Sequence, residues 1–395
     1  MDNCQGKMPN LLFENRFLIF GKNYNKMHNM HVKKFYKKNF VFCVAFVLAL
    51  LSCFLVPPNA NYLTYVDGRT IGCLFGTLAV IGALRNIRFF KSVARWIIAQ
   101  TGNTRAAVIT LVCITFVGSM LIANDMALIT FLPLGFVVLS STKKEKYMAF
   151  TFVMQNIAAN LGGMLTPFGN PQNLFLYSYF NISNAEFIHI MFPPFLLAVS
   201  LILLCCWFGV NKEKLVLPKR KIKLPLLRTM LYLMLFVFAI AIVFRAVPYL
   251  FGIIVIAACL WMMDKKALKK LDYPLLGTFF CFFIFAGNVS QMESVHAFFN
   301  YILSYSVLLV SVISCQFISN VPTAILLSRF TENYPALLLG VNIGGVGTLV
   351  ASLASLITFR EYTRHYPHKT KSYLKTFFIF NFFFLIVLTG FCLIK

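Results

Sequence analysis

The chain has 395 residues, of which 59% are hydrophobic and only 12% are charged. This balance excludes a soluble domain of this size, so most of the chain is expected to face lipid or other membrane helices. The formal net charge of +24 does not indicate a nucleic-acid-binding protein, because the Lys and Arg residues lie in short links between apolar runs and form no continuous patch.

The N-terminal residues 1–39 are rich in Lys and Arg and precede an apolar run at 40–56. No small-residue cleavage signal follows this run, so it is predicted to be a retained membrane anchor. Basic residues collect on the cytoplasmic side of membrane proteins. We therefore expect a cytoplasmic N-tail over 1–39 and a multi-pass protein of the plasma or inner membrane.

The first transmembrane repeat is predicted to span 40–210. A second helix at 70–84 returns to a basic stretch at 85–105, and the next basic cluster is at 143–146. Between the two clusters lies an apolar segment, 106–140, whose only charge is Asp125. Both of its flanks are basic and therefore cytoplasmic, so we expect a re-entrant helical hairpin, with two full helices as the alternative.

A broken helix is expected to follow this hairpin. It starts at Tyr147 and is interrupted by the Gly- and Pro-rich residues 162–173, and a helix at 189–209 then returns to the inside. The strongly basic residues after it begin a linker and connecting helix, 211–248.

The second repeat is predicted to span 249–395, with helices at 249–263 and 273–289, a second hairpin within 294–328, a broken helix at 335–358 and a final helix. With this topology every Lys and Arg lies on the cytoplasmic side except Arg69, Arg245, Arg329 and Lys395, which lie on the outer side or at its edge. The predicted fold is an all-α polytopic membrane protein with two inverted repeats, about nine transmembrane helices, two re-entrant hairpins and two broken helices.

Two motifs recur in the two halves. Residues 123–127 (ANDMA) match 319–323 (SNVPT), and 160–166 (NLGGMLT) match 342–348 (NIGGVGT) without gaps. The single crossing at 229–245 would invert the second half relative to the first. Inverted repeats with broken helices place an ion site near the membrane midplane, because half-helix ends and unwound backbone can coordinate ions there.

The segments 160–174, 319–328 and 340–355, together with Asn124 and Asp125, resemble the ion transporter superfamily. Within it the chain, over roughly 60–365, is similar to the arsenite permease, NhaD-type antiporter and citrate transporter group. In the sodium-coupled dicarboxylate members each hairpin tip carries Ser-Asn-Thr. This chain has Ala123-Asn124-Asp125 and Ser319-Asn320-Val321 instead, so the resemblance favours the arsenite and antiporter branches over a sodium-dicarboxylate mechanism.

Asp125 is the only acid in the middle of an apolar run, and a charge at that depth indicates function unless it merely caps a helix. The paired Asn residues would line the site, or else serve only as interhelical hydrogen-bond partners. The predicted ion-binding set, with no catalytic residue and no metal cage, is Asn124, Asp125, Asn160, Thr166, Gly169, Asn170, Asn173, Ser319, Asn320, Thr323, Asn342 and Thr348.

These features predict a secondary active permease that moves a small inorganic or organic anion, coupled to H⁺ or Na⁺. A Na⁺/H⁺ antiporter is the alternative within transport, and a channel or an integral-membrane enzyme is the alternative outside it. The sequence has no GxxxxGK[ST], HExxH or GxSxG motif, so no enzyme activity is expected. Membrane lipid and a small ion are the expected partners, with no cofactor beyond the coupling ion. A homodimer and a separate ATPase subunit are left open.

Overall fold

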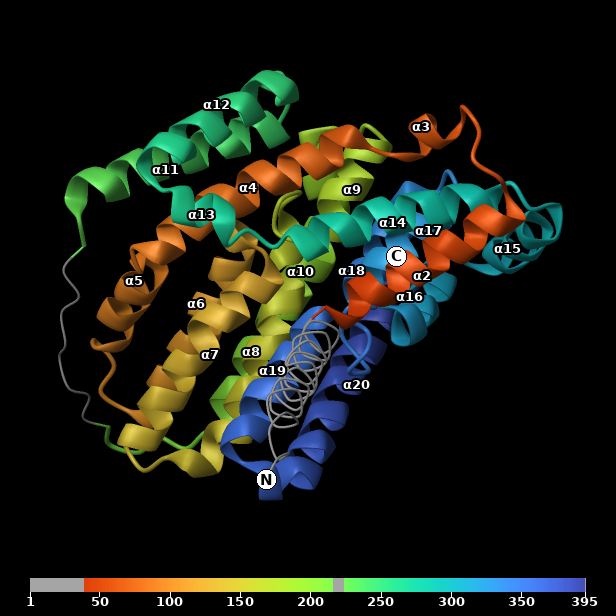
Figure 1. Ribbon diagram of the computed structural model, residues 1–395. Helices are drawn as coiled ribbons and strands as arrows, with labels where there is room; N and C mark the ends of the chain where they lie inside the picture. Colours follow the sequence, from red (N-terminus) through yellow and green to blue (C-terminus); the bar gives the residue numbers. More distant parts are fainter. Residues whose placement is uncertain (1–38, 216–223, 395) are drawn as a thin grey trace, which may run out of the picture.

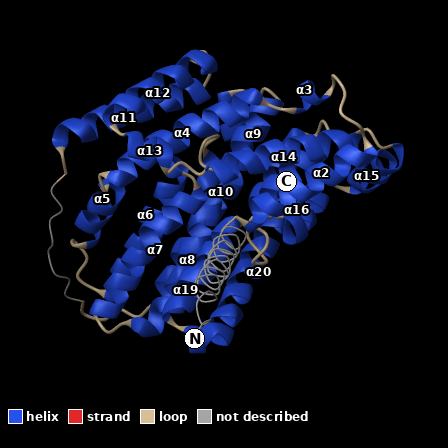
Figure 2. Ribbon diagram, in the orientation of Figure 1, coloured by secondary structure: helices blue, strands red, loops and turns tan. Residues whose placement is uncertain are grey.

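The computed structural model describes residues 39–215 and 224–394 (Figure 1). The predicted N-tail lies almost wholly outside the described residues, as do four of the linker bases, Lys219, Arg220, Lys221 and Lys223. Across the described ranges the chain is helical without a β-strand (Figure 2), apart from one isolated bridge between Asn103 and Lys214.

The first half of the chain begins with α2 (Phe40–Leu55), a single turn α3 (Tyr62–Tyr65) and the long α4 (Gly68–Asn86). Asp67 caps α4 by accepting hydrogen bonds from the backbone N–H groups of Arg69 and Thr70. The elements that follow are α5 (Phe89–Ile98), α6 (Thr104–Ile122), α7 (Asn124–Ser141), η1 (Glu145–Tyr147), α8 (Met148–Gly162), η2 (Gly163–Leu165), α9 (Pro171–Tyr179) and α10 (Asn184–Gly209).

The second half repeats this order after one additional helix, α11 (Leu226–Val243). Its elements are α12 (Tyr249–Met263), α13 (Lys265–Lys269), α14 (Tyr273–Ser290), α15 (Glu293–Tyr305), α16 (Val307–Ile318), α17 (Asn320–Leu327), α18 (Tyr334–Ile343), α19 (Leu353–His365), η3 (Pro367–Lys369) and α20 (Thr370–Ile394).

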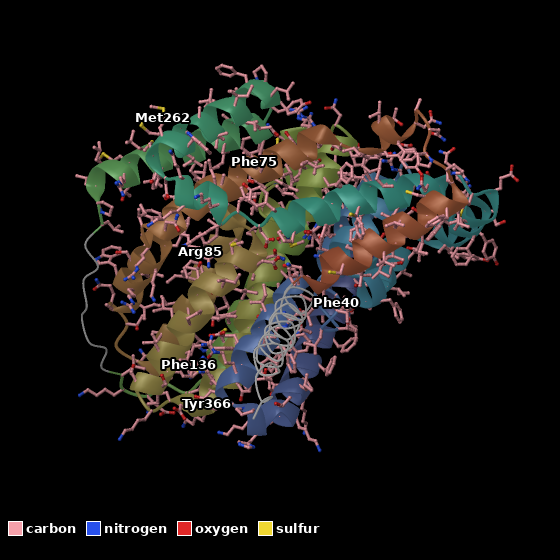
Figure 3. The ribbon with its side chains drawn as sticks, in the orientation of Figure 1. Phe40, Phe75, Arg85, Phe136, Met262 and Tyr366 are labelled. Atoms are coloured by element: carbon pink, nitrogen blue, oxygen red, sulfur yellow. The ribbon has the colours of Figure 1, made fainter. Side chains whose placement is uncertain are left out.

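Six of the described helices are long and apolar enough to cross a membrane, or up to eight if each of two bent pairs counts as one span. The expectation of about nine counts different helices. It includes α2 and α12, which are only 16 and 15 residues long, and the two broken helices, whose longest piece has 15 residues, and it leaves out α6 and α7, the arms of the first predicted hairpin, which are among the six. Large apolar side chains cover the outside: Phe40 is 64% exposed, and Met262, labelled in Figure 3, is 84% exposed. Lipid is the environment that suits such a surface.

The helices pack reciprocally between the two halves of the chain. α2 packs on α14, and its counterpart α12 packs on α4, where α11 also lies (Figure 1). α7 packs on α19, and its counterpart α17 packs on α9. Each hairpin therefore contacts the second piece of the other half's broken helix, which brings residues far apart in sequence to one place.

The predicted hairpin at 106–140 corresponds to α6 and α7, which pack against each other. The prediction for 294–328 needs correction, because α15 bends away from α16 by 118° and only α16 and α17 form the hairpin. Ser306 marks the break: its backbone is extended and its hydroxyl accepts the Leu309 N–H, which starts a new helix. α5, which bends from α4 by 60°, occupies the equivalent place before the first hairpin.

Both broken helices have local causes. Between η2 and α9 the chain is unwound around Gly169 and Asn170, and Pro171 then occupies the first turn of α9, where its missing N–H costs nothing. Between α18 and α19 the unwound stretch includes Gly347, whose φ of +121° suits glycine. Ser352 caps α19 by accepting the Ser355 N–H.

Candidate functional site

The two hairpin tips share an unusual backbone conformation. Ala123 has φ 62° and ψ 147°, and Ser319 has φ 73° and ψ 157°, values that non-glycine residues rarely adopt. The next residue, Asn124 or Asn320, accepts the N–H of the residue after it at 2.9 Å through its own Oδ1. The sequence match between the tips therefore corresponds to the same local structure, including a strain of about 1–3 kcal/mol that surrounding contacts must offset.

The unwound segments are attached to the hairpins in the same way in both halves. Thr166 Oγ1 donates to the Met120 carbonyl at 2.7 Å, and Thr348 Oγ1 donates to the Gln316 carbonyl at 2.9 Å. Met120 and Gln316 each stand three residues before a hairpin tip. The predicted pairing of Thr166 with Thr348 thus places each hydroxyl at an equivalent position beside its hairpin.

A chain of buried amides joins the two halves. Asn124 Nδ2 donates to Asn160 Oδ1 at 3.2 Å, and Asn170 Nδ2 donates to the Asn160 carbonyl at 3.3 Å and to Asn342 Oδ1 at 3.2 Å. Asn342 Nδ2 then donates to Asn173 Oδ1 at 2.6 Å. The first hairpin tip, its broken helix and the broken helix of the second half therefore meet in one network of side chains, all nearly inaccessible to solvent.

The second hairpin tip contacts its own unwound segment. The Asn320 backbone N–H donates to the Ala351 carbonyl at 3.0 Å, and Ser319 Oγ donates to the same carbonyl at 3.3 Å. The Thr323 hydroxyl donates to the Ser319 carbonyl within α17. A Cβ at Gly345 would lie 3.1 Å from Asn320 Nδ2, so glycine allows this close approach.

Gly169 has a similar role in the first half. A Cβ there would lie 2.4 Å from the Gly163 carbonyl oxygen and 2.6 Å from Thr166 Oγ1, so no other residue fits without moving the backbone. Asn173 Nδ2 crosses this turn, donating to the carbonyls of Gly163 at 3.1 Å and Met164 at 3.3 Å. The unwound segment is therefore a tightly packed loop held by its own side chains.

Several buried side-chain oxygens near this network have no hydrogen-bond partner within the described parts of the chain, among them Asp125 Oδ1, Asn170 Oδ1, Gln172 Oε1 and Asn156 Oδ1. A buried acceptor without a partner is costly, and each such atom calls for a ligand, a water molecule or a proton. Asp125 is attached to the amide chain through its N–H, which donates to Asn124 Oδ1. These oxygens could bind a cation or a protonated group.

Sequence reasoning missed Gln316 and a second polar cluster. Asn156 Nδ2 lies 3.3 Å from Ser355 Oγ and 3.4 Å from Asn381 Oδ1, so it connects α8 with α19 and α20. Asn156 is one helical turn before Asn160 and has no counterpart in the repeat, which pairs it with Leu338. Comparison of the two repeats therefore could not identify Asn156, and its spacing of one helical turn from Asn160 was the only signal in the sequence.

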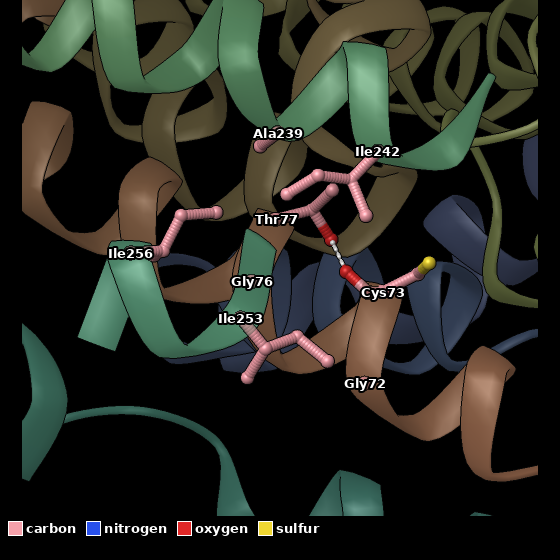
Figure 4. Close-up of a pocket in the computed structure, with 8 residues that line it drawn as sticks. All are labelled: Gly72, Cys73, Gly76, Thr77, Ala239, Ile242, Ile253 and Ile256. Carbon is pink, nitrogen blue, oxygen red and sulfur yellow. Dashed lines mark hydrogen bonds between the residues drawn. The ribbon is translucent and has the colours of Figure 1, made fainter. Parts of the chain in front are cut away.

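A small apolar pocket lies elsewhere, between α4, α11 and α12 (Figure 4). It is lined mainly by Ile and small residues, and its Thr77 hydroxyl is bonded to the Cys73 carbonyl at 2.9 Å. It contains none of the predicted site residues and offers no free polar group, so it is not the candidate ion site.

Comparison with protein families decides the class of this chain. The family model described as "Citrate transporter" matches residues 37–335, which is more than half of the sequence. The chain belongs to the citrate transporter family. The match ends at the start of α18, so the second broken helix of this citrate transporter family member lies beyond it.

Several relatives are transporters or membrane proteins. An uncharacterized transporter of Methanocaldococcus jannaschii is 30% identical over 80% of this chain and 86% of its own length. The inner membrane protein YbiR of Escherichia coli is 27% identical over 78% of this chain and 84% of its own. A silicon efflux transporter of rice, Oryza sativa, is 27% identical over 36% of this chain and 30% of its own.

A solved structure shows the same fold. The crystal structure of the YdaH transporter of Alcanivorax borkumensis matches with a TM-score of 0.52, covering 89% of this chain and 96% of that one at 10% identity. Family, relatives and fold together establish that this citrate transporter family member is a membrane transport protein, and they point to a permease rather than an enzyme.

Proposed function

We propose that this protein is a secondary active permease that moves a small anion, driven by Na⁺ or H⁺, through the amide network between its two hairpins. The observation that carries the proposal is that network itself: Asn124, Asn160, Asn170 and Asn342 from both halves meet in one buried cluster. An anion has two suitable contacts there, since amide N–H groups and the N-terminal ends of the hairpin helices favour negative charge.

The coupling ion would use the oxygens that lack partners. Asp125 and Asn170 each carry a buried oxygen that has no hydrogen bond among the residues that the structure describes, and Asn170 stands in the unwound segment just before α9. Oxygen ligands of this kind suit Na⁺, and a carboxylate also suits a proton. We propose Asp125 as the residue that binds and releases the coupling ion.

The other predicted site residues have supporting roles in this proposal. Thr166, Thr348 and Gly169 shape the unwound segments, while Ser319, Asn320 and Thr323 build the second tip. In the membrane we place the N-terminus in the cytoplasm and the two repeats in opposite orientations, in a plasma or inner membrane. The matched tips and the reciprocal packing support the opposite orientations of the two repeats.

A Na⁺/H⁺ antiporter is the second candidate. It is favoured by one observation: Asp125 is the only acid in the network, and its counterpart in the second half is Val321. In that case no anion would cross, and the carboxylate alone would alternate between a proton and Na⁺.

The two candidates separate in proteoliposomes containing the purified protein. Uptake of citrate, arsenite, phosphate and silicate is followed under an inward Na⁺ gradient, an inward proton gradient and no gradient, with a pH-sensitive dye inside. The proposal predicts saturable accumulation of at least one of these solutes that requires one gradient. Na⁺-driven proton efflux without uptake of any solute would instead identify the antiporter.

A further inference from the structure

The hairpin tips of the two halves differ in how they are bonded to their unwound segments, although their backbones match. In the second half the Gln316 side chain enters the unwound segment. Its Nε2 donates to the carbonyls of Gly344 at 3.0 Å and Val346 at 3.2 Å, and its Oε1 accepts the Thr348 N–H at 2.9 Å. Together with the Ser319 hydroxyl bond, these contacts fasten the second hairpin to its broken helix.

The first half cannot make the same contacts. Met120 stands where Gln316 stands, and Ala123 stands where Ser319 stands, so both the amide and the hydroxyl are missing. The carbonyls equivalent to those that Gln316 reaches are those of Gly162 and Met164, and the Met164 carbonyl accepts instead from Asn173, which belongs to the broken helix and not to the hairpin. The unwound segment is joined to this tip by the Thr166–Met120 bond, while Asn124–Asn160 and the Ser119–Ala158 carbonyl bond join the tip to α8 instead.

The unpartnered oxygens show the same asymmetry. Asp125 Oδ1 and Asn170 Oδ1 lie in the first half, whereas within 316–323 and 342–355 every buried side-chain N or O atom has a partner. The hairpin with fewer bonds to its unwound segment is therefore the one with free oxygen ligands. The hairpin that is bonded to its unwound segment by Gln316 and Ser319 has its polar groups occupied by the protein itself.

We propose that the transporter binds one coupling cation, in the first half only, and that Gln316 permanently replaces the ion in the second half. This inference rests on the proposed function. The cation draws Asp125 towards the unwound segment and fastens the first hairpin. Gln316 and Ser319 fasten the second hairpin with their own donors, so Gln316 acts as a positioning residue and the second hairpin needs no ion.

The charged groups around Asp125 are consistent with a cation bound there. Asp272, at the start of α14, is also an acid, and its negative charge repels that of Asp125. Arg85 on α4 has its Nη1 3.5 Å from the Sδ atom of Met126, the residue after Asp125. A bound Na⁺ or proton would neutralise the repulsion between the two acids.

Hydrogen exchange of the tip peptides tests this proposal on the purified full-length protein. Protection factors of residues 119–127 and 315–323, corrected for the intrinsic effect of pH, are compared at about pH 8 without Na⁺, at the same pH with Na⁺, and at about pH 6 without Na⁺. We expect protection of the first tip to rise about tenfold or more in one of the two cation conditions. The second tip should be protected in all three and change less than about twofold.

Variants assign these effects to residues. Gln316→Met copies Met120 and should lower protection of the second tip by about tenfold or more, and the milder Ser319→Ala, which copies Ala123, should lower it less. Gln291→Met, at an exposed position after α14, is the matched control and should change neither tip. Asp125→Asn should remove the response of the first tip to the cation.

Equal responses of both tips to the cation, or an unchanged second tip in folded Gln316→Met and Ser319→Ala, would overturn the proposal. Absence of any cation response at the first tip would overturn it as well. The hydrogen-exchange readout does not require transport. A protein that moves none of the tested anions, but in which the cation protects the first tip alone, would count against the proposed anion transport and support the single cation site.

Discussion

At the scale of single residues, the site is made almost entirely of neutral amides and one acid. Asparagine both donates and accepts, so neighbouring asparagines can hydrogen-bond to one another and exchange partners when an ion enters. Asp125 differs because its carboxylate only accepts while it is charged. Its Oδ1 is left without a partner, as that chemistry leads one to expect.

The first prediction concerns that carboxylate. Asp125→Asn keeps the size of the side chain but cannot exchange a proton, so it should abolish accumulation driven by a cation or by pH. Folding should remain intact, and downhill exchange of the anion, measured in proteoliposomes, should persist because it needs no coupling ion. Concentrative transport that is unaltered in this variant between about pH 6 and 8 would reduce Asp125 to a helix cap.

The second prediction concerns the amide that connects the halves. Asn342→Ala removes the bonds to Asn173 Oδ1 and to the Leu338 carbonyl. Leaving buried groups unpaired costs about 1–3 kcal/mol, so transport rate should fall about tenfold to a hundredfold. Initial uptake rates measure this, with Asn300→Ala, at an exposed site on α15, as the control. Equal rates for wild type and a folded Asn342→Ala would remove Asn342 from the site.

At the scale of elements, hydrogen bonds and ion pairs hold the first hairpin at its open end, the end opposite the tip, where α6 begins and α7 ends. Glu213, after α10, accepts hydrogen bonds from Tyr147 at 2.7 Å and pairs with Lys144 and with Lys146, the latter at 2.7 Å. Its own carbonyl accepts the Thr104 N–H at 2.8 Å. These contacts join the start of α6 and the link between α7 and α8 to the end of α10.

The third prediction uses the pKa of Glu213, which hydrogen bonds from Lys144, then Lys146 and Tyr147, lower from 4.5 to about 2. A lowered pKa means that the ionised form stabilises the fold above pH 4.5, and this stabilisation is lost as pH falls towards about 2. Glu213→Gln should therefore lower the thermal midpoint at neutral pH, and its difference from wild type should shrink across that interval. A difference that does not depend on pH would contradict the role of the charge.

Prediction from sequence succeeded for residues that recur in both halves of the chain and failed for residues that occur in one half only. The tips and broken helices were found because Asn124 and Asn160 recur as Asn320 and Asn342. Gln316 was missed, since its counterpart is Met120 and its contacts depend on how the loop folds back. The sequence did not reveal α5 and α15 as separate helices. α5 lies in a basic stretch and α15 in an apolar one, and periodicity alone does not separate either from the adjacent helix. The bends that separate them arise only from tertiary packing.

At the scale of the whole molecule, the reciprocal contacts explain how one site can be built from distant segments. α7 rests on α19 and α17 rests on α9, so each hairpin is supported by the other half of the chain. If the two halves lie inverted in a membrane, the hairpins enter from opposite faces and their tips meet at the depth of the amide network. The site could then open to one side at a time without breaking the packing within each hairpin.

The labelling of cysteines at the open ends of the two hairpins tests this arrangement most directly. Thr142→Cys lies after α7, and Glu332→Cys lies in the exposed link after α17. In sealed vesicles of known orientation, a membrane-impermeant maleimide should label Thr142→Cys only from the cytoplasmic face and Glu332→Cys only from the outer face, above the background of the unsubstituted protein. Labelling of both cysteines from the same face would contradict the inverted hairpins and the shared site built on them.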